Sequence, residues 1–336
     1  MNQTCCIQLF RGFCRLSKTG SGLLTGSILG LMFWSLIMIV TGFHEKELHH
    51  NIPAGEIVAW GLDDNGQVSN IPAGSDFVAV SAGNRHNLAL RRDGSLVSWG
   101  RDSGRQISDT PEGNDFVAIA AGYDYSLAVR TNGTVEVWGW VEYQLKEAPP
   151  SGEYTDAAAG FHHALILRRD GGITAWGHDF GGELHLVQLY DTPSDEGYIR
   201  ISANRNHSLA LRNDGTVHAW GRDLMGSVND TPIDDGFIDV AAGARHSLAL
   251  REDGTIEAWG WDMRGEVSGT PAEPGFVAIS VGYTHSLALH QDGHIVAWGW
   301  DRNDAGQTRD VPKEGRFVAI SAGEFHNLSI RDNDSR

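Results

Sequence analysis

The chain has 336 residues, 42 of them glycine, and a formal net charge of −17. An acidic surface repels the phosphate backbone of nucleic acids, so we expect no nucleic-acid partner. All three cysteines (Cys5, Cys6 and Cys14) lie at the amino-terminal end, which excludes a disulfide framework and a thiolate metal site from the rest of the chain. The abundant glycine indicates many turns, and its recurrence at fixed positions favours many short strands over a disordered chain.

Residues 1–43 have the pattern of an export segment. Three basic residues precede the uncharged run 19–43, and an acidic, histidine-rich stretch follows it. This order predicts a membrane-inserted helix with its basic end inside, either a signal that is cleaved or an anchor that is retained. We therefore expect residues 44–55 to form a linker. The remainder of the protein is expected to be exported, anchored in the cell envelope or secreted.

A Trp-Gly pair recurs along the rest of the chain. Successive tryptophans are separated by 39, 39, 38, 44, 39 and 39 residues. They are Trp60, Trp99, Trp138, Trp176, Trp220, Trp259 and Trp298. A repeat of about 39 residues indicates an architecture built from stacked modules.

The repeat is clearest between residues 236 and 260, where it predicts three strands. Phe237–Val240 is a short apolar run, and His246–Arg251 alternates between two kinds of side chain. The pair Asp253-Gly254 then precedes Thr255–Trp259. An Asp-Gly pair favours a tight β-hairpin, because glycine tolerates the positive φ that such turns need.

A three-stranded unit is too small to bury both of its faces, so the units must stack. The predicted fold is all-β, a seven-bladed β-propeller over residues 56–334. The strand expected at 56–61 precedes the first full repeat, whereas the last repeat (317–333) lacks its third strand. We therefore expect the two ends to complete one blade. A parallel β-helix is the alternative, and the antiparallel hairpin turns disfavour it.

Across residues 56–333 the repeats combine the motifs Ala-Gly-x-x-His-x-Leu-Ala-Leu, Asp-Gly and Trp-Gly. In these motifs the chain resembles the regulator of chromosome condensation repeat family. Its short repeats are similar to the compact bacterial extracellular branch, which includes the propeller-type β-lactamase inhibitory protein. The resemblance implies a propeller that presents an aromatic loop face to a target. An exported, acidic chain without a long inserted wedge departs from the nuclear exchange factor that founded the family.

One histidine per repeat occupies the start of the second predicted strand, with Tyr125 in its place in one repeat. These histidines are His86, His163, His207, His246, His285 and His326. A ring of histidines cannot converge on one metal ion, so we expect no metal site there and a hydrogen bond from each to neighbouring backbone. The Trp-Gly tryptophans are expected to pack between blades. An aspartate three residues after most of them is expected to cap its own turn, with a cation site as the alternative.

The predicted topology places the Ala-Gly turns and the residue after each Trp-Gly on one face, and the Asp-Gly turns on the other. The first face varies between repeats and is rich in the aromatic and arginine side chains that dominate binding interfaces. The predicted binding residues are Trp140, Trp261, Trp300, Tyr123, Tyr283, Phe161, Phe325, Arg85, Arg205 and Arg245. The alternative is that these rings pack onto neighbouring loops.

The sequence therefore predicts an extracytoplasmic, monomeric propeller that binds a protein or glycan, with no cofactor. It would contact the membrane only through residues 1–43, if these are retained. The sequence has no nucleophile elbow, His-Glu-x-x-His motif or phosphate-binding glycine loop, so we expect no catalytic residues and no enzyme activity. Two alternatives are an envelope hydrolase acting on polysaccharide at the central channel, and a guanine-nucleotide exchange factor suggested by the resemblance alone.

Overall fold

The structure, a computed structural model, describes residues 53–141, 145, 147–177, 189, 191–301 and 305–333. The predicted export helix and most of the predicted linker lie outside these residues. Within the described ranges every regular element is a β-strand, and no helix is long and apolar enough to span a membrane. The all-β prediction is confirmed for this part of the chain.

The strands are short and follow one another at regular intervals. The first eleven are β1 (Gly55–Gly61), β2 (Phe77–Ala82), β3 (His86–Arg91), β4 (Leu96–Gly100), β5 (Phe116–Ala121), β6 (Tyr125–Arg130), β7 (Val135–Gly139), β8 (Tyr154–Ala159), β9 (His163–Arg168), β10 (Ile173–Gly177) and β11 (Tyr198–Ala203). The others are β12 (His207–Arg212), β13 (Val217–Gly221), β14 (Phe237–Ala242), β15 (His246–Arg251), β16 (Ile256–Gly260), β17 (Phe276–Val281), β18 (His285–His290), β19 (Ile295–Gly299), β20 (Phe317–Ala322) and β21 (His326–Asp332).

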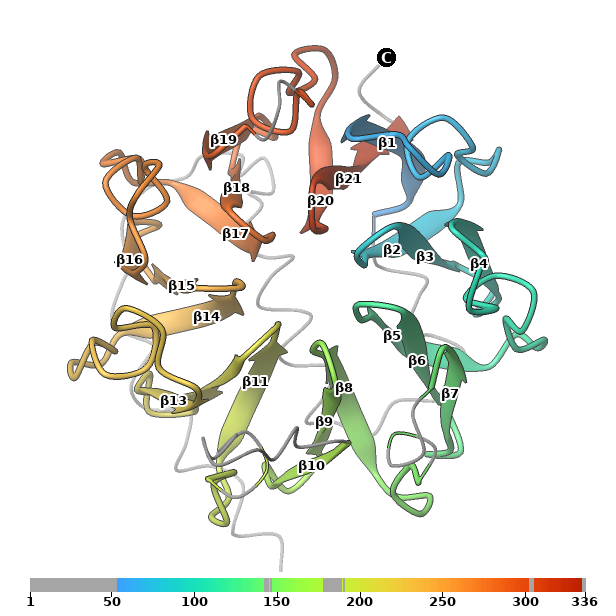
Figure 1. Ribbon diagram of the computed structural model, residues 1–336, viewed down its shortest axis with the longest axis horizontal. Helices are drawn as coiled ribbons and strands as arrows, with labels where there is room; N and C mark the ends of the chain where they lie inside the picture. The colour runs from blue at the N-terminus through green and yellow to red at the C-terminus, as the bar shows by residue number, and fades with distance from the viewer. Residues whose placement is uncertain are drawn as a thin grey trace, which may run out of the picture. The chain divides into compact units, whose positions relative to one another are not determined.

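Apart from one bridge between Gly55 of β1 and Phe77 of β2, the strands pair in antiparallel sets of three, and each set is called a blade below. In the blade of β14, β15 and β16, for example, Ala249 of the central strand faces Val240 on one side and Glu257 on the other. The blades stand around a common axis with their first strands innermost (Figure 1). Repeated three-stranded blades, as predicted from the sequence, are therefore the building unit.

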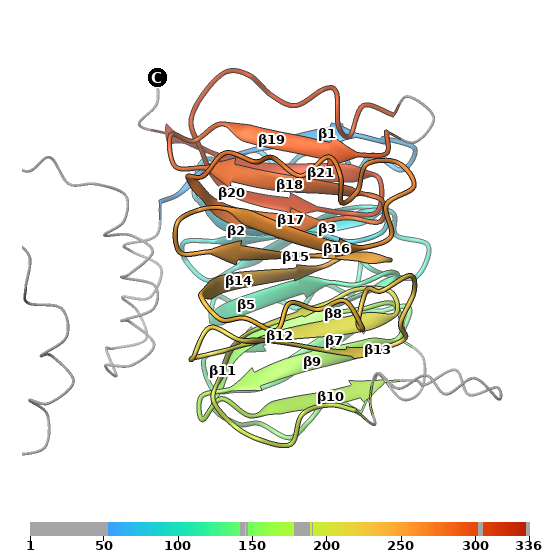
Figure 2. The same ribbon diagram turned by 90° about the vertical axis from the view of Figure 1, so that its left-hand side faces the viewer.

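The strand β1 joins the two ends of the described chain. It pairs along its whole length with β21, from Gly55 opposite Asp332 to Gly61 opposite His326. The innermost strands contact one another in the order β2, β5, β8, β11, β14, β17 and β20, and β20 also contacts β2. Seen from the side, strands of successive blades lie one above another (Figure 2). Segments far apart in the sequence thus share one sheet.

The core lies between neighbouring blades. Trp259 of β16 and Phe237 of β14 pack against Leu209 and Leu211 of the preceding blade, and all four are buried. The indole Nε1 of Trp259 donates to the carbonyl oxygen of Ser227, in the loop that leaves that preceding blade, at 3.1 Å. Each large side chain buried in this way contributes roughly 1.5–3 kcal/mol, and the hydrogen bond fixes the orientation of the ring.

The Asp-Gly pairs form the hairpin turns that the sequence predicted. Gly254 has a φ of +81°, and a Cβ on it would lie 2.4 Å from the backbone nitrogen of Gly275, so both conformation and space require glycine. The Asp253 carboxylate accepts the backbone N–H of Thr255 at 2.9 Å. This turn joins β15 to β16 and lies at one end of its blade.

Candidate binding face

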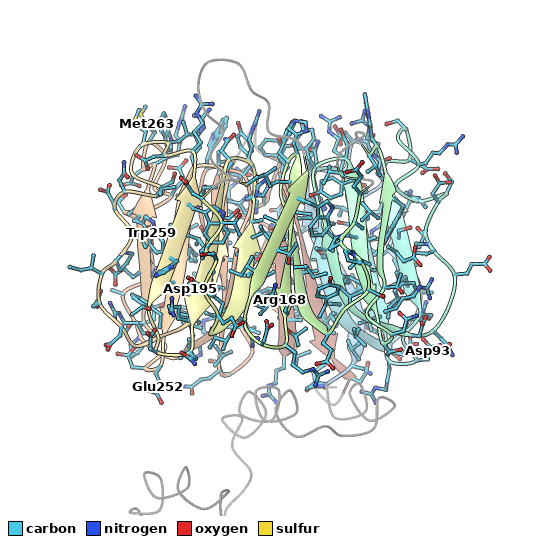
Figure 3. All side chains as sticks on the ribbon, turned by 90° about the horizontal axis from the view of Figure 1, so that it is seen from below. Asp93, Arg168, Asp195, Glu252, Trp259 and Met263 are labelled. Atoms are coloured by element: carbon cyan, nitrogen blue, oxygen red, sulfur yellow. The ribbon has the colours of Figure 1, made fainter. Side chains whose placement is uncertain are left out.

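The Ala-Gly turns and the loops that follow Trp-Gly meet at one end of the blades, here named the Trp-Gly face. The backbone N–H of Trp261, directly after a Trp-Gly pair, donates to the carbonyl oxygen of Arg245 in the Ala-Gly turn at 3.0 Å. In Figure 3 Met263, in the same loop, lies at one end of the blades and Glu252, beside an Asp-Gly turn, lies at the other. The two kinds of turn are therefore on opposite faces.

The repeated histidines form a buried belt between the blades. This histidine belt consists of His86, His163, His207, His246, His285 and His326. Each Nε2 lies 2.6–2.9 Å from a serine or asparagine oxygen of the next blade, as His246 does from Ser286 Oγ. The sequence predicted a backbone partner. A backbone hydrogen bond with Tyr125 is made by His86, but the partner of every Nε2 is a side chain, at the residue that follows the belt position of the next blade.

Tyr125 stands where the other repeats have histidine, and it faces a blade without a polar partner. The residue after His163 is Ala164, whose methyl group cannot hydrogen-bond. The Tyr125 hydroxyl reaches past it and donates to the His163 carbonyl oxygen at 2.6 Å. Both Tyr125 and Ala164 are buried, so a larger side chain and a smaller one compensate each other in volume and in hydrogen bonding.

Burial keeps the histidine belt neutral. It lowers the pKa of His86, His207 and His285 to about 4, and that of His163, His246 and His326 to about 3. A buried neutral imidazole with Nε2 held by the next blade links the blades together. The belt is therefore part of the scaffold beneath the face, and the candidate site lies in the turns.

Side chains from separate Ala-Gly turns form a set named the aromatic arc: Tyr123, Phe161, Arg205 and Tyr283. The ring centroids of Tyr123 and Phe161 are 3.9 Å apart. The Arg205 guanidinium lies 5.2 Å from the Phe161 centroid and 5.1 Å from that of Tyr283, and its Nη1 donates to the Tyr283 hydroxyl at 2.8 Å. Ala244, buried in the intervening turn, leaves room for Arg205 to span it. Four predicted binding residues are thus in one group.

Two other predicted binding residues have structural partners. The Phe325 ring lies 5.6 Å from that of Tyr283, and Phe325 is only 3 % exposed. It supports the arc and offers almost no surface of its own. Arg85 pairs with Asp64 at 3.3 Å, and both side chains stay partly exposed. The contact with Tyr283 joins two separate Ala-Gly turns, which the sequence pattern did not show.

The three predicted tryptophans lie in the loops after Trp-Gly, outside the aromatic arc. The Arg245 guanidinium lies over the Trp261 ring at 5.0 Å, and that of Arg264 over Trp300 at 5.3 Å. Trp140 is 60 % exposed. Cation–π contacts therefore cover one face of two of these rings and hold them in place, whereas Trp140 faces solvent.

Two exposed methionines on the Trp-Gly face were missed by the sequence analysis. Met225 is 68 % and Met263 70 % exposed, each in the loop that follows a Trp-Gly pair. The available signal was a methionine at the fourth or fifth residue after the tryptophan of two Trp-Gly pairs, where the other repeats carry no methionine. Methionine is flexible and polarizable, and it suits surfaces that adapt to an apolar partner.

A cavity of about 280 Å³ lies on the axis, with the aromatic arc and Asp239 of β14 among its lining residues. Asp156 and Arg200 occupy the register position of Asp239 on the first strands of the two preceding blades. The remaining first strands have alanine at this position: Ala79, Ala118, Ala278 and Ala319. Asp156, Arg200 and Asp239 are named the channel triad, and the sequence analysis missed them inside apolar strand patterns.

The channel triad holds three charges at close quarters. Burial raises the pKa of Asp156 and raises that of Asp239 to about 6, while the charge of Arg200 lowers both. Each carboxylate accepts the backbone N–H of the residue that follows it, at 2.8 and 3.0 Å. Among the described residues Arg200 makes no ion pair, and its Nη1 donates to the Ile199 carbonyl oxygen at 3.4 Å. These groups interact through space without direct contact.

The aspartates after the Trp-Gly pairs cap their own loops. The Asp262 carboxylate accepts the backbone N–H groups of Val267 and Ser268, both at 2.9 Å. The hydrogen bond from Ser268 holds the pKa of Asp262 below its ordinary value. Each cap shapes the loop that carries Trp261 or its counterpart onto the face.

The repeats match a known sequence family. Residues 77–106, 198–226, 237–265 and 276–307 match the family described as the regulator of chromosome condensation (RCC1) repeat. Four repeats of the chain therefore belong to the RCC1 repeat family. No curated protein sequence matches this RCC1-repeat chain.

Solved structures place the RCC1-repeat chain among β-propellers. Prp20p of Saccharomyces cerevisiae is 20% identical, with a TM-score of 0.66 over 87% of this chain and 96% of that one. Human WBSCR16 is 15% identical, with a TM-score of 0.65 over 82% and 98%. The ectodomain of the Arabidopsis thaliana receptor kinase ACR4 is 20% identical, with a TM-score of 0.63 over 76% and 90%. At these identities the likeness establishes the fold alone.

Proposed function

We propose that the RCC1-repeat chain closes into a seven-bladed β-propeller whose ends share one blade. The full-length pairing of β1 with β21 supports the shared blade. His326 Nε2, in that blade, lies 2.6 Å from Asn87 Oδ1 in the blade of β2, β3 and β4, which continues the histidine belt across the junction. Closure of this kind fixes the Ala-Gly turns around one axis and turns them into a continuous surface.

We further propose that the propeller is exported, with residues 1–43 as a cleaved signal or a retained anchor. The support is the uncharged run 19–43 between basic and acidic flanks. Fusing a reporter enzyme that is active only outside the cytoplasm after residue 55 tests this. The reporter should be active, and deleting residues 2–43 should silence it. An inactive fusion at full expression contradicts export.

The function that the geometry supports best is the capture of a partner protein by the Trp-Gly face. The observation that carries this is the aromatic arc, held together by contacts of 3.9 and 2.8 Å at the cavity on the axis. Side chains that are ordered before binding lose little conformational freedom when a partner docks. Exposed Trp140, Met225 and Met263 add apolar surface on the same face.

A protein suits this face better than a glycan. Sugars stack on the open face of an aromatic ring, whereas Trp261 and Trp300 each have a guanidinium over one ring face. The methionines favour an irregular apolar surface of the kind that proteins present. Prp20p, which shares the fold, has binding properties to Gsp1p and histones, which are also proteins.

Site-specific photo-crosslinking in native cells tests the proposal. A photoreactive amino acid replaces Met263 on the Trp-Gly face or Glu252 on the opposite face, and both positions are exposed. We expect a crosslinked protein only from position 263. Arg205→Ala in the same background should reduce its yield at least tenfold, because the arc loses its central member, while the melting temperature changes little.

The control at Glu252 shows whether crosslinking is specific to the Trp-Gly face or results from random encounters in the cell. Equal crosslinking from both positions contradicts the proposal. An unchanged yield in the Arg205→Ala variant contradicts the role of the aromatic arc and leaves the loops after Trp-Gly as the contact surface.

A second candidate function, hydrolysis of a polysaccharide, is favoured by one observation. Asp239 lines the axial cavity with a pKa of about 6, and the Asp156 carboxylate contributes to raising it. A carboxyl group protonated near pH 6 can serve as a general acid beside a second carboxylate. Release of reducing sugar from envelope polysaccharide at pH 6 by the wild type, lost in Asp239→Asn, would establish it. An inactive wild-type protein removes this candidate.

A further inference from the structure

The hairpin between β18 and β19 brings two histidines and an aspartate together at the end of the blade opposite the Trp-Gly face. His290 is the last residue of β18, and Asp292 and His294 belong to the turn. The Nδ1 atoms of His294 and His290 lie 2.6 and 3.0 Å from Asp292 Oδ1. One possible ligand atom from each residue lies within 4.8 Å of the other two.

Sister hairpins of the same chain show what is unusual about this one. In β15 the residue equivalent to His290 is Arg251, whose guanidinium lies 4.1 Å from the Phe237 centroid and pairs with Asp234. The same stacking and pairing is made by Arg91, Arg130 and Arg212. At the position of His294 these hairpins have a hydroxyl residue: Ser95, Thr134, Thr216 and Thr255. The hairpin between β18 and β19 differs from these hairpins at both positions, and both differences introduce an imidazole.

The surroundings hold the His290 ring in position. The ring of Phe276 meets it edge-on, with centroids 5.6 Å apart. A Cβ on Gly275 would lie 2.5 Å from His290 Nε2, so this nitrogen packs against the backbone of Gly275, while Nδ1 faces Asp292. The hairpin bond from His290 N–H to the His294 carbonyl oxygen, 2.9 Å long, places the second ring 4.7 Å from the first. Three donor side chains thus share one side of a short, well-defined turn.

We propose that His290, Asp292 and His294 bind a divalent transition-metal ion, of which Zn²⁺ is the representative. Zn²⁺ takes imidazole nitrogen and carboxylate oxygen at about 2.0–2.2 Å, which separates the ligands of a tetrahedral site by about 3.3–3.5 Å. The two histidine–aspartate separations, 2.6 and 3.0 Å, are slightly shorter than that, and all three donor atoms lie within 4.8 Å of one another, so small side-chain rotations bring them to the tetrahedral spacing. Replacing arginine by histidine also removes the cation that would repel a metal ion in the sister hairpins.

Three protein ligands leave one tetrahedral position open. Water or a donor side chain from another molecule can fill it. The site lies on the face opposite the aromatic arc, and it is independent of the partner capture proposed above. Its donor set of two imidazoles and one carboxylate suits Zn²⁺, Ni²⁺ and Cu²⁺, and it does not suit Ca²⁺ or Mg²⁺, which prefer oxygen ligands alone.

Isothermal titration calorimetry with ZnCl₂ at pH 7.5 on the full chain tests the proposal. The matched variant is His290→Arg/His294→Thr, which rewrites the turn as Arg-x-Asp-Gly-Thr, the sequence of the folded hairpin Arg251–Thr255. Histidines elsewhere in the chain, including those that follow residue 43, are present in both proteins. We expect the wild type to bind one equivalent of Zn²⁺ more than the variant. Identical stoichiometry and affinity in the two proteins overturn the proposal.

A second variant guards against a folding defect in the first. Asp292→Asn keeps the side-chain volume and removes the charge that faces both imidazoles. We expect Zn²⁺ affinity at this site to fall at least tenfold with the melting temperature in a chelator unchanged. Co²⁺ provides the spectroscopic probe: visible ligand-field bands should develop in the wild type and be lost in both variants. Co²⁺ bands of equal intensity in all three proteins also overturn the proposal.

Discussion

The histidine belt and the channel triad show two different responses to a departure from the repeat. In the belt, Tyr125 replaces histidine, and Ala164 of the next blade replaces the side chain that histidine would meet. In the channel, Asp156, Arg200 and Asp239 replace alanine, and among the described residues no ion pair joins them. The change to Tyr125 is matched by the change to Ala164 in the next blade, whereas the changes in the channel leave charges at half-buried positions.

This difference separates positions whose side chains maintain the fold from positions whose side chains serve a function. A matched pair of substitutions keeps packing and hydrogen bonding intact, so it leaves stability nearly unchanged. Buried charge without a direct partner lowers stability, and proteins retain such groups mainly at functional sites. In a repeat protein, a residue that differs from its counterparts in the other repeats and has no matching change in its neighbours is therefore the better guide to function.

Acid should affect the belt more than any other region. The belt histidines have a pKa of about 3–4 when folded and 6.5 when unfolded, so the unfolded state binds more protons as the pH falls below 6.5. Stability is complete above that pH and declines toward pH 4, by up to about 8 kcal/mol per pH unit for the belt. Urea unfolding at pH 7.5, 6 and 5 measures this. A constant midpoint contradicts a buried neutral belt.

Restoring the repeat at one belt position should break the matched pair. Tyr125→His loses the ring packing and the hydrogen bond to the His163 carbonyl oxygen, and it places Nε2 opposite Ala164. The loss should be about 2–4 kcal/mol in the free energy of unfolding. Adding Ala164→Ser supplies the missing oxygen and should recover about 1 kcal/mol or more. Strictly additive effects in this double-mutant cycle would show that the two positions are not coupled.

Removing a charge from the channel should raise the free energy of unfolding, whereas breaking the matched pair in the belt lowers it. Asp239→Ala restores the residue of four sister strands and should stabilise the protein by about 1–2 kcal/mol at pH 8. Burial raises the folded pKa of Asp239 to about 6, so this carboxylate takes up a proton below that pH in the folded wild type. The destabilisation caused by its charge is then removed. The difference in the free energy of unfolding between the variant and the wild type should therefore be smaller at pH 5 than at pH 8. A difference that grows on acidification contradicts the assignment.

The smallest effect is expected at an exposed ring. Trp140→Ala should change the free energy of unfolding by less than about 0.5 kcal/mol, because Trp140 is 60 % exposed. Trp138, two residues earlier, is 6 % exposed and donates to the Gln106 carbonyl oxygen, so Trp138→Ala should cost about 3–5 kcal/mol. Thermal unfolding of both variants makes the comparison. Similar losses in the two proteins would place Trp140 in the core.

Much of the fold could be predicted because its signals are local. Alternation in His246–Arg251, the glycine of Asp253-Gly254 and the apolar run from Phe237 each act within a few residues, and their recurrence confirmed the strand assignment. Contacts between blades were harder to predict. The partner of Tyr125 is 38 residues away, and a local pattern carries no information about it until the register between blades is known.

The sequence predicted that the arc residues share one face, and it did not predict their mutual contacts. The topology placed Tyr123, Phe161, Arg205 and Tyr283 on one face, but their mutual contacts depend on the small side chain of Ala244 in the intervening turn. The channel triad was missed because each member lies inside an apolar strand pattern. Lining up equivalent positions across the repeats would have found it, since only three of them are charged.

The pairing of β1 with β21 also governs when the protein can finish folding during translation. Residues 55–61 leave the ribosome early, whereas the strand that hydrogen-bonds them begins only at residue 326. For almost the whole of synthesis this segment is an open strand edge, the kind of edge that pairs wrongly with other chains. A chaperone that shields it would act throughout that interval, and release would be timed by the arrival of the final strand.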